Sequence, residues 1–199
     1  MTQHALRLLT IGLGVVVTSP VLAGHPDVFI LPLSGAIGLP THQTQDACAA
    51  LAEQLSKLKV SAIVAEPTPA WEELAAFANA SGPRLTVGLQ VNESSSCPTV
   101  SAPKRVTAAS APPPPEGAPL EQAIRDATEA ARTGESASLA VAIAQRGRWC
   151  SGRATRSEAY VLSNVLSPIV VVTLPSKKAA DLSIGLAATL AQAVRREHP

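Results

Sequence analysis

The chain has 199 residues, of which 46% are apolar, enough to bury one hydrophobic core of ordinary size. The net charge of +1 is too small to attract polyanions in general, and aromatic residues make up only 3% of the chain. Few side chains can therefore stack on the bases of single-stranded nucleic acid. These values indicate one domain and argue against nucleic acid as a partner.

Residues 1–23 have the pattern of a secretory signal. Arg7 supplies a positive start, residues 8–17 are almost wholly apolar, and the small residues before position 24 place the cleavage site after Ala23. The apolar run is shorter than the roughly 20 residues that span a bilayer. We therefore expect cleavage rather than an uncleaved anchor, which is the alternative. Residues 24–199 would then form a periplasmic or extracellular domain without a stable membrane anchor.

Three cysteines would enter an oxidising compartment, where disulfides form. Cys48 lies on the apolar face of a predicted helix, so we expect it to be a small core residue. Cys97 and Cys150 flank predicted loops and are the better candidates for a disulfide.

The first half of the chain alternates between strand and helix patterns. Short apolar runs predict strands at 27–33, 60–65 and 84–91, and spacings of three and four predict helices through 47–58 and over 70–79. We expect Thr44 or Asp46 to cap the first of these helices. Such alternation is typical of right-handed crossovers onto a parallel sheet. The predicted fold class is a single three-layer α/β domain with a mostly parallel central sheet flanked by helices.

Seven prolines fall between residues 98 and 119, a density that argues against a regular core element. We interpret this segment as a solvated loop inserted in the domain, with a proline-rich motif for a partner as the alternative. Further elements are predicted in this order: helices at 120–132 and 135–146, strands at 160–165 and 169–174, and a helix at 176–196.

Four strings of the sequence resemble one family of bacterial cell-wall enzymes. They are LPLSGA at 31–36, GLQVNE at 88–93, SLAVAIAQRG at 138–147 and YVLSNVLSPIVVVTLP at 160–175. Together with the order of the elements, they are similar to the zinc-dependent N-acetylmuramoyl-L-alanine amidases, over almost all of residues 27–196. The resemblance implies an amidase-like α/β fold, a zinc cofactor and hydrolysis of the bond between N-acetylmuramic acid and the peptide stem.

The residues that carry this chemistry in the family are replaced here. The three zinc-ligand positions fall on Ser34, Thr44 and Gln90, and the catalytic Glu position falls on Thr173, while Asn92 is kept. Hydroxyl and amide groups bind zinc poorly at neutral pH, so no metal would activate a water molecule. Threonine also cannot exchange protons as a carboxylate does. The resemblance therefore implies a domain without zinc and without catalysis.

These five positions form the predicted ligand-binding cleft, and peptidoglycan fragments or a cell-wall protein are the expected partners. The alternative is an active amidase whose metal site is atypical, drawing on His25, His42, Asp46 or Glu93. A third possibility, an unrelated exported α/β domain, would be indicated by a different sheet order or by Ser34, Gln90 and Thr173 lying far apart.

Four arginines, Arg146, Arg148, Arg153 and Arg156, fall within eleven residues. Their guanidinium groups would suit the carboxylates of stem peptides or the phosphates of wall polymers. The alternative is a solvated helix end, where positive charge is favoured by the helix dipole.

Overall fold

A computed structural model of the chain describes residues 25–34, 39–103, 120–145, 149–150 and 156–196. The predicted signal at 1–23 and most of the proline-rich segment, residues 104–119, lie outside the described residues. The strands are β1 Val28–Pro32, β2 Ala62–Val64, β3 Leu85–Asn92, β4 Thr99–Ser101 and β5 Ile169–Pro175. The helices are α1 His42–Lys57, α2 Trp71–Ser81, α3 Leu120–Gln145, α4 Arg156–Asn164, the 3₁₀ turn η1 Ser176–Lys178, and α5 Ala179–Arg196.

The five strands form one sheet in the order β2-β1-β3-β5-β4, and the neighbours among β2, β1, β3 and β5 are parallel. β4 pairs antiparallel with β5 at the sheet edge. The predicted α/β fold class, with a mostly parallel sheet between helices, is thus confirmed.

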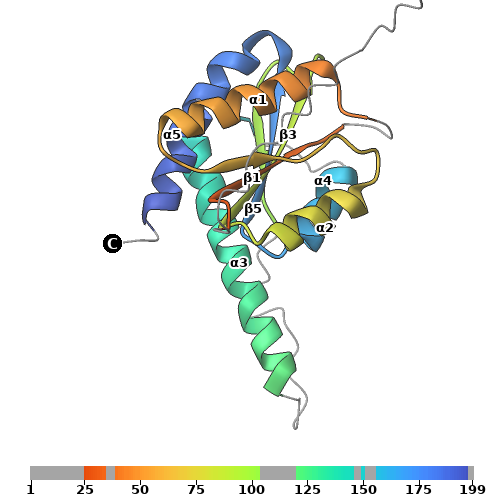
Figure 1. Cartoon of the computed structure of the whole chain (residues 1–199), viewed down its shortest axis with the longest axis vertical. Helices are drawn as coiled ribbons and strands as arrows, with labels where there is room; N and C mark the ends of the chain where they lie inside the picture. Colours follow the sequence, from red (N-terminus) through yellow and green to blue (C-terminus); the bar gives the residue numbers. More distant parts are fainter. Residues whose placement is uncertain (1–24, 35–38, 104–119, 146–148, 151–155, 197–199) are drawn as a thin grey trace, which may run out of the picture.

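Helices cover both faces of the sheet, and Figure 1 shows α1, α3 and α5 on one side and α2 and α4 on the other. Alternation along each strand divides the core into two clusters. In β1, Val28 and Ile30 pack with α1, α3 and α5, whereas Phe29 and Leu31 pack with α2 and α4. β5 is buried along its whole length, as expected for a strand with covered faces and a neighbour on each side.

The segment predicted as a strand at 160–165 is a helix instead, α4. Val161, Leu162 and Val165 are buried together on the face that meets the sheet, and Val165 N–H donates to the Val161 carbonyl at 3.1 Å. A short apolar run containing valines fits both a strand and a buried helix, so its pattern alone misled the prediction.

Three other features of the secondary structure differ from the predictions. The helices expected at 120–132 and 135–146 are one helix, α3, which continues through Gly134 although a glycine there costs about 1 kcal/mol relative to alanine. Thr41, rather than Thr44 or Asp46, caps α1. Within the proline-rich segment, Thr99–Ser101 forms strand β4, because these three residues contain no proline and pair with β5.

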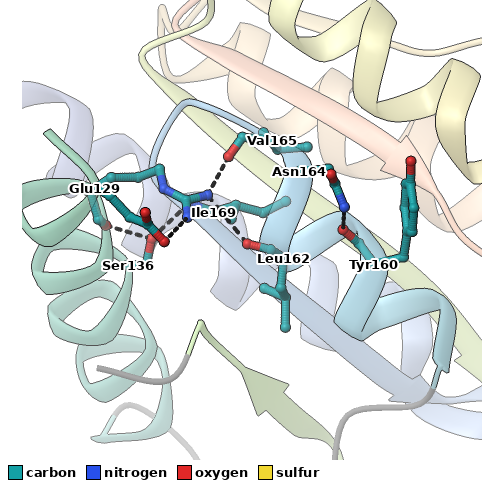
Figure 2. A network of polar contacts seen from close by, with 8 residues as sticks. Glu129, Ser136, Tyr160, Leu162, Asn164, Val165 and Ile169 are labelled. Carbon is teal, nitrogen blue, oxygen red and sulfur yellow. Dashed lines mark hydrogen bonds and ion pairs between the residues drawn. The ribbon is translucent and has the colours of Figure 1, made fainter. Parts of the chain in front are cut away.

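Polar contacts fix α3 against α4 and β5, as Figure 2 shows. The Arg132 guanidinium donates to the main-chain carbonyls of Leu162, at 3.2 Å, and Val165, where α4 ends. The buried hydroxyl of Ser136 accepts a hydrogen bond from Ile169 N–H, the first residue of β5, at 2.9 Å. These contacts satisfy main-chain groups that the secondary structure leaves unpaired.

An acidic residue joins the amino ends of three strands. The Asp27 carboxylate accepts hydrogen bonds from Ser61 N–H at 2.9 Å and from the Ser61 hydroxyl at 3.0 Å. It also forms an ion pair with Arg84 at 3.4 Å. Burial favours the neutral carboxyl, but these hydrogen bonds and the Arg84 charge outweigh burial and lower the pKa of Asp27.

Among the helices described, none combines the length and apolar character needed to cross a bilayer.

Candidate functional site

Two polar side chains meet at the carboxyl ends of the central strands. Gln90 on β3 and Thr173 on β5 are register partners, and the Gln90 amide donates a 2.8 Å hydrogen bond to the Thr173 hydroxyl. Both are buried, with 4% and 6% of their surfaces exposed. Strand alternation places Thr173 on the same face as Val171, toward α2 and α4. Two residues of the predicted site, Gln90 and Thr173, are therefore in direct contact and buried.

Thr44 lies in the first turn of α1, which covers the face of the sheet opposite α2 and α4. From that face it contacts the carboxyl end of β3. It is 1% exposed, and its hydroxyl accepts a 3.0 Å hydrogen bond from Val91 N–H, the residue after Gln90. The hydroxyls of Thr41 and Thr44 lie 3.1 Å apart, and Thr41 caps the helix by accepting from Thr44 N–H at 3.2 Å. Thr41 is a residue of the site that sequence reasoning missed, although a threonine directly before a helix is a preferred N-cap residue.

Ser34 and Asn92 lie at the rim of the same region. Leu33 N–H donates to the Leu89 carbonyl at 2.8 Å, which brings the partly exposed Ser34 beside the end of β3. Asn92 is exposed, and its side-chain oxygen accepts from Ser94 N–H at 2.9 Å, which starts the turn after the strand. The positions predicted to converge therefore share one sheet edge, with a buried interior and an exposed rim.

A disulfide between Cys97 and Cys150 borders this rim, as expected from the sequence. Cys150 N–H donates to the Pro98 carbonyl at 2.9 Å, and Cys150 also bridges to Thr99 of β4, which is the register partner of Thr173. Thr99 was not singled out from the sequence, because a three-residue strand between prolines gives little periodic signal.

The predicted core position of Cys48 is confirmed: it is a buried free cysteine, and burial raises the pKa of its thiol to about 12.

The side chains at this sheet edge do not fit a zinc ion. The buried groups are two hydroxyls and one amide, and their hydrogen bonds join β3 to β5 and to α1. Catalytic zinc sites use imidazole, thiolate or carboxylate ligands, which these positions do not supply. No step of a metal-dependent reaction can therefore be assigned to Ser34, Thr44, Gln90 or Thr173.

Two of the residues considered for an atypical metal site, His25 and Glu93, form polar contacts with different partners. A ring nitrogen of His25 lies 3.1 Å from the Ser81 carbonyl, and Glu93 accepts from the Gln43 amide at 3.4 Å. Within the described ranges, no three His, Cys, Asp or Glu side chains are grouped closely enough to hold a metal ion.

The predicted arginine cluster cannot be placed. Arg146, Arg148 and Arg153 lie outside the described residues, and Arg156 is described only as the first residue of α4. Contacts of this cluster with anions stay a prediction.

Comparison with known proteins shows what fold this is. An N-acetylmuramoyl-L-alanine amidase from Clostridium difficile 630 superposes with a TM-score of 0.50 at 16% identity, covering 86% of this chain and 96% of that one. The amidase Ami1 from Mycobacterium smegmatis superposes with a TM-score of 0.54 at 15% identity, covering 85% and 94%. No family model matches the sequence, and neither does any curated protein.

The chain is thus an α/β domain with the fold of N-acetylmuramoyl-L-alanine amidases. The resemblance seen in the sequence is supported at the level of fold. At 15% to 16% identity the likeness carries no activity across by itself, so function depends on the side chains at the sheet edge.

Proposed function

We propose that this domain binds peptidoglycan fragments, or a protein of the cell-wall machinery, without hydrolysing them. The observation that carries the proposal is the buried hydrogen bond between Gln90 and Thr173 at the carboxyl end of the sheet. In open α/β folds, ligands bind at the carboxyl ends of the strands. This general rule supports a ligand site at that end of the sheet, and the neutral side chains argue against metal-assisted chemistry there.

The rim of the site suits a glycopeptide ligand better than a charged polymer. Asn92 is exposed and Ser34 partly exposed, so amide and hydroxyl groups face solvent around a buried, internally bonded centre. Such groups recognise sugar hydroxyls and peptide amides through neutral hydrogen bonds. Export of the chain, by the predicted signal at 1–23, would bring the domain to the compartment that holds this polymer.

Cosedimentation with purified sacculi tests binding. We expect the exported chain to pellet with sacculi, and Asn92→Asp to weaken binding by about threefold to tenfold, the worth of one or two hydrogen bonds. This substitution keeps the oxygen that accepts from Ser94 N–H, so the turn should survive. Ser138→Ala, an exposed hydroxyl on α3, is the matched control. Equal binding by Asn92→Asp and the parent would contradict the proposed rim.

Installing zinc ligands tests the second half of the proposal. If Ser34, Thr44 and Gln90 occupy the ligand positions implied by the resemblance, the triple variant Ser34→His/Thr44→Glu/Gln90→His should retain about one zinc per chain after dialysis. The parent should retain none. A folded triple variant without zinc would refute this assignment of positions.

A further inference from the structure

Three polar side chains form a row across the carboxyl end of the sheet. Gln90 on β3 pairs with Thr173 on β5, and Thr173 pairs in turn with Thr99 on β4. Residues directly opposite one another in neighbouring strands point to the same face of a sheet. Gln90 and Thr173 are buried, whereas Thr99 is partly exposed. The row therefore extends the candidate site from its buried pair to a position that a ligand can reach.

One loop crosses this end of the sheet. We call residues 93–98, which connect β3 to β4, the rim loop. β3 and β4 lie on opposite sides of β5, so the rim loop passes the carboxyl end of β5. At its start, the Asn92 side-chain oxygen accepts from Ser94 N–H at 2.9 Å. Further along, the Ser95 hydroxyl donates to the Cys97 carbonyl at 2.6 Å. The rim loop thus sets the distance between the two sides of the proposed binding rim.

The disulfide fastens the far end of the rim loop. Cys97 is joined to Cys150, two residues before β4 begins. The main chain of Cys150 also donates to the Pro98 carbonyl at 2.9 Å and forms a β-bridge with Thr99. The neighbouring Trp149 packs against the core cluster beneath α1, α3 and α5. The rim loop is therefore tied to a segment that is itself anchored in the core.

β4 is a weak strand without this tie. It contains three residues, Thr99–Ser101, and lies at the edge of the sheet, where it pairs with β5. Short edge pairings are marginal by themselves, and regions with few buried apolar contacts open locally before the rest of a domain. Loss of the disulfide should therefore free the rim loop and β4 while β1, β3 and β5 stay paired.

We propose that ligand binding at this end of the sheet requires the Cys97–Cys150 disulfide, which holds Thr99 and the rim loop in the shape that the ligand meets. Reduction would then switch binding off. This inference rests on the proposed function, because it concerns the control of that same site. A loop that is already ordered binds more tightly, since binding does not have to order it. We expect reduction to weaken binding by at least about tenfold.

The switching step is thiol–disulfide exchange with a dithiol reductant. Cys150 is exposed and Cys97 is partly exposed, so a thiolate of the reductant can attack the Cys150 sulfur. The bond between the two protein sulfurs breaks, and the Cys97 sulfur leaves as a thiolate that takes up a proton. The second thiol of the reductant then displaces the Cys150 sulfur as a thiol. The protein gains two electrons and two protons, and the dithiol becomes a disulfide.

Cosedimentation with sacculi, with and without dithiothreitol, tests the requirement. The oxidised chain should bind, the reduced chain should bind at least about tenfold more weakly, and reoxidation should restore binding. Cys97→Ser/Cys150→Ser should bind weakly under both conditions, which controls for effects of the reductant on the sacculi. Cys48→Ala should respond to dithiothreitol like the parent, because Cys48 is a free cysteine in the core.

A second variant tests the place of Thr99 in the site with the disulfide intact. Thr99→Val keeps the side-chain shape and removes the hydroxyl, so it should weaken binding of the oxidised chain by about threefold to tenfold. Ser101→Ala is the matched control. It removes a hydroxyl from the same strand and the same face, but Ser101 pairs with Val171, further from the carboxyl end. Equal binding by Thr99→Val and the parent would remove Thr99 from the site.

The outcomes separate this inference from the proposed function. Equal binding by the oxidised and reduced chains would overturn the inference and leave the proposed function standing. A parent chain that does not bind sacculi in either state would overturn both. Far-UV circular dichroism of the reduced chain should match that of the oxidised chain, because the expected opening is local. Global unfolding on reduction would also contradict the inference.

Discussion

Gln90 and Thr173, which are 83 residues apart in the chain, join β3 to β5 by a buried side-chain hydrogen bond of 2.8 Å. The bond lies at the carboxyl ends of the strands, where ligands bind in open α/β folds, and it joins two neutral groups that bind zinc poorly. Loss of this hydrogen bond should lower the stability of the domain. Thr173→Val should lower the free energy of unfolding by about 1–3 kcal/mol, because it leaves a buried amide without this acceptor.

Urea denaturation measures this effect, and a double-mutant cycle isolates it. Gln90→Leu combined with Thr173→Val should cost less than the sum of the two single changes, since replacing both partners removes the unsatisfied group. Strict additivity would show that the two side chains do not interact in solution.

Thr44 should matter more for the fold than a threonine in a helix ordinarily does. Thr44→Val keeps the shape but removes the acceptor for Val91 N–H and the contact with Thr41, so we expect a loss of about 1–3 kcal/mol. Thr41→Ala removes the helix cap and should cost about 1 kcal/mol. Thermal or urea unfolding compares the two. A Thr44→Val variant as stable as the parent would mean that α1 is not held to β3 through this hydroxyl.

The cysteines should give a clear pattern of thiol reactivity. The folded chain should react with no thiol reagent at pH 8, because Cys97 and Cys150 are joined and Cys48 is buried with a pKa of about 12. Denaturant without reductant should expose one thiol, and denaturant with reductant should expose three. A single fast-reacting thiol in the folded chain would show that Cys48 is accessible.

Removing the disulfide should destabilise the domain. Cys97 and Cys150 are separated by 53 residues, and closing a loop of that length restricts the unfolded chain by about 4 kcal/mol in the entropic account. Cys97→Ser/Cys150→Ser should therefore unfold at a lower urea concentration than the parent. Thr99 of β4 forms a β-bridge with Cys150 and pairs with Thr173 of β5. Loss of the disulfide should therefore loosen β4 before the rest of the sheet. Hydrogen exchange at Val100 would report this, and unchanged protection there would contradict it.

Asp27 should make stability depend on pH in one direction. Its pKa is lowered in the folded state, so the stabilisation is present above the unfolded value of about 3.9 and is lost as the pH falls through the folded value. Asp27→Asn should therefore be less stable than the parent at pH 7, and the difference should shrink below about pH 4. Urea unfolding at several pH values measures this. A difference that does not change with pH would show that the charge on Asp27 is not involved.

The sequence predicted the sheet well where apolar runs and helix spacing agree. The strands at 27–33, 84–91 and 169–174 and the packing face of α1 followed from local patterns, because such runs can satisfy their backbone only inside a covered sheet. The run at 160–165 failed because a few residues containing valine do not distinguish strand from helix. The break expected near Gly134 failed because tertiary contacts of Ser136 and Leu139 override a glycine's weak helix propensity.

The positions of the candidate site were predicted from a resemblance, whereas their contacts with one another were not predicted. Ser34, Thr44, Gln90 and Thr173 were assigned from a resemblance, and strand topology brings their backbone positions to one edge. Which of them bond to one another depends on register and on the entry angle of α1. These are set by long-range packing, as the contact between Thr44 and Val91 illustrates. For the same reason Thr41 and Thr99 became visible only in the structure.

We propose that the neutral carboxyl end of this sheet leaves the domain able to bind cell-wall material and unable to cut it. The most direct test incubates the purified chain with sacculi in the presence of zinc and measures the muropeptides released, with total zinc per chain determined on the same sample. The account predicts chain bound to sacculi, no zinc retained after dialysis and no release above buffer. Release of muropeptides that stops on chelation and returns with zinc would contradict it.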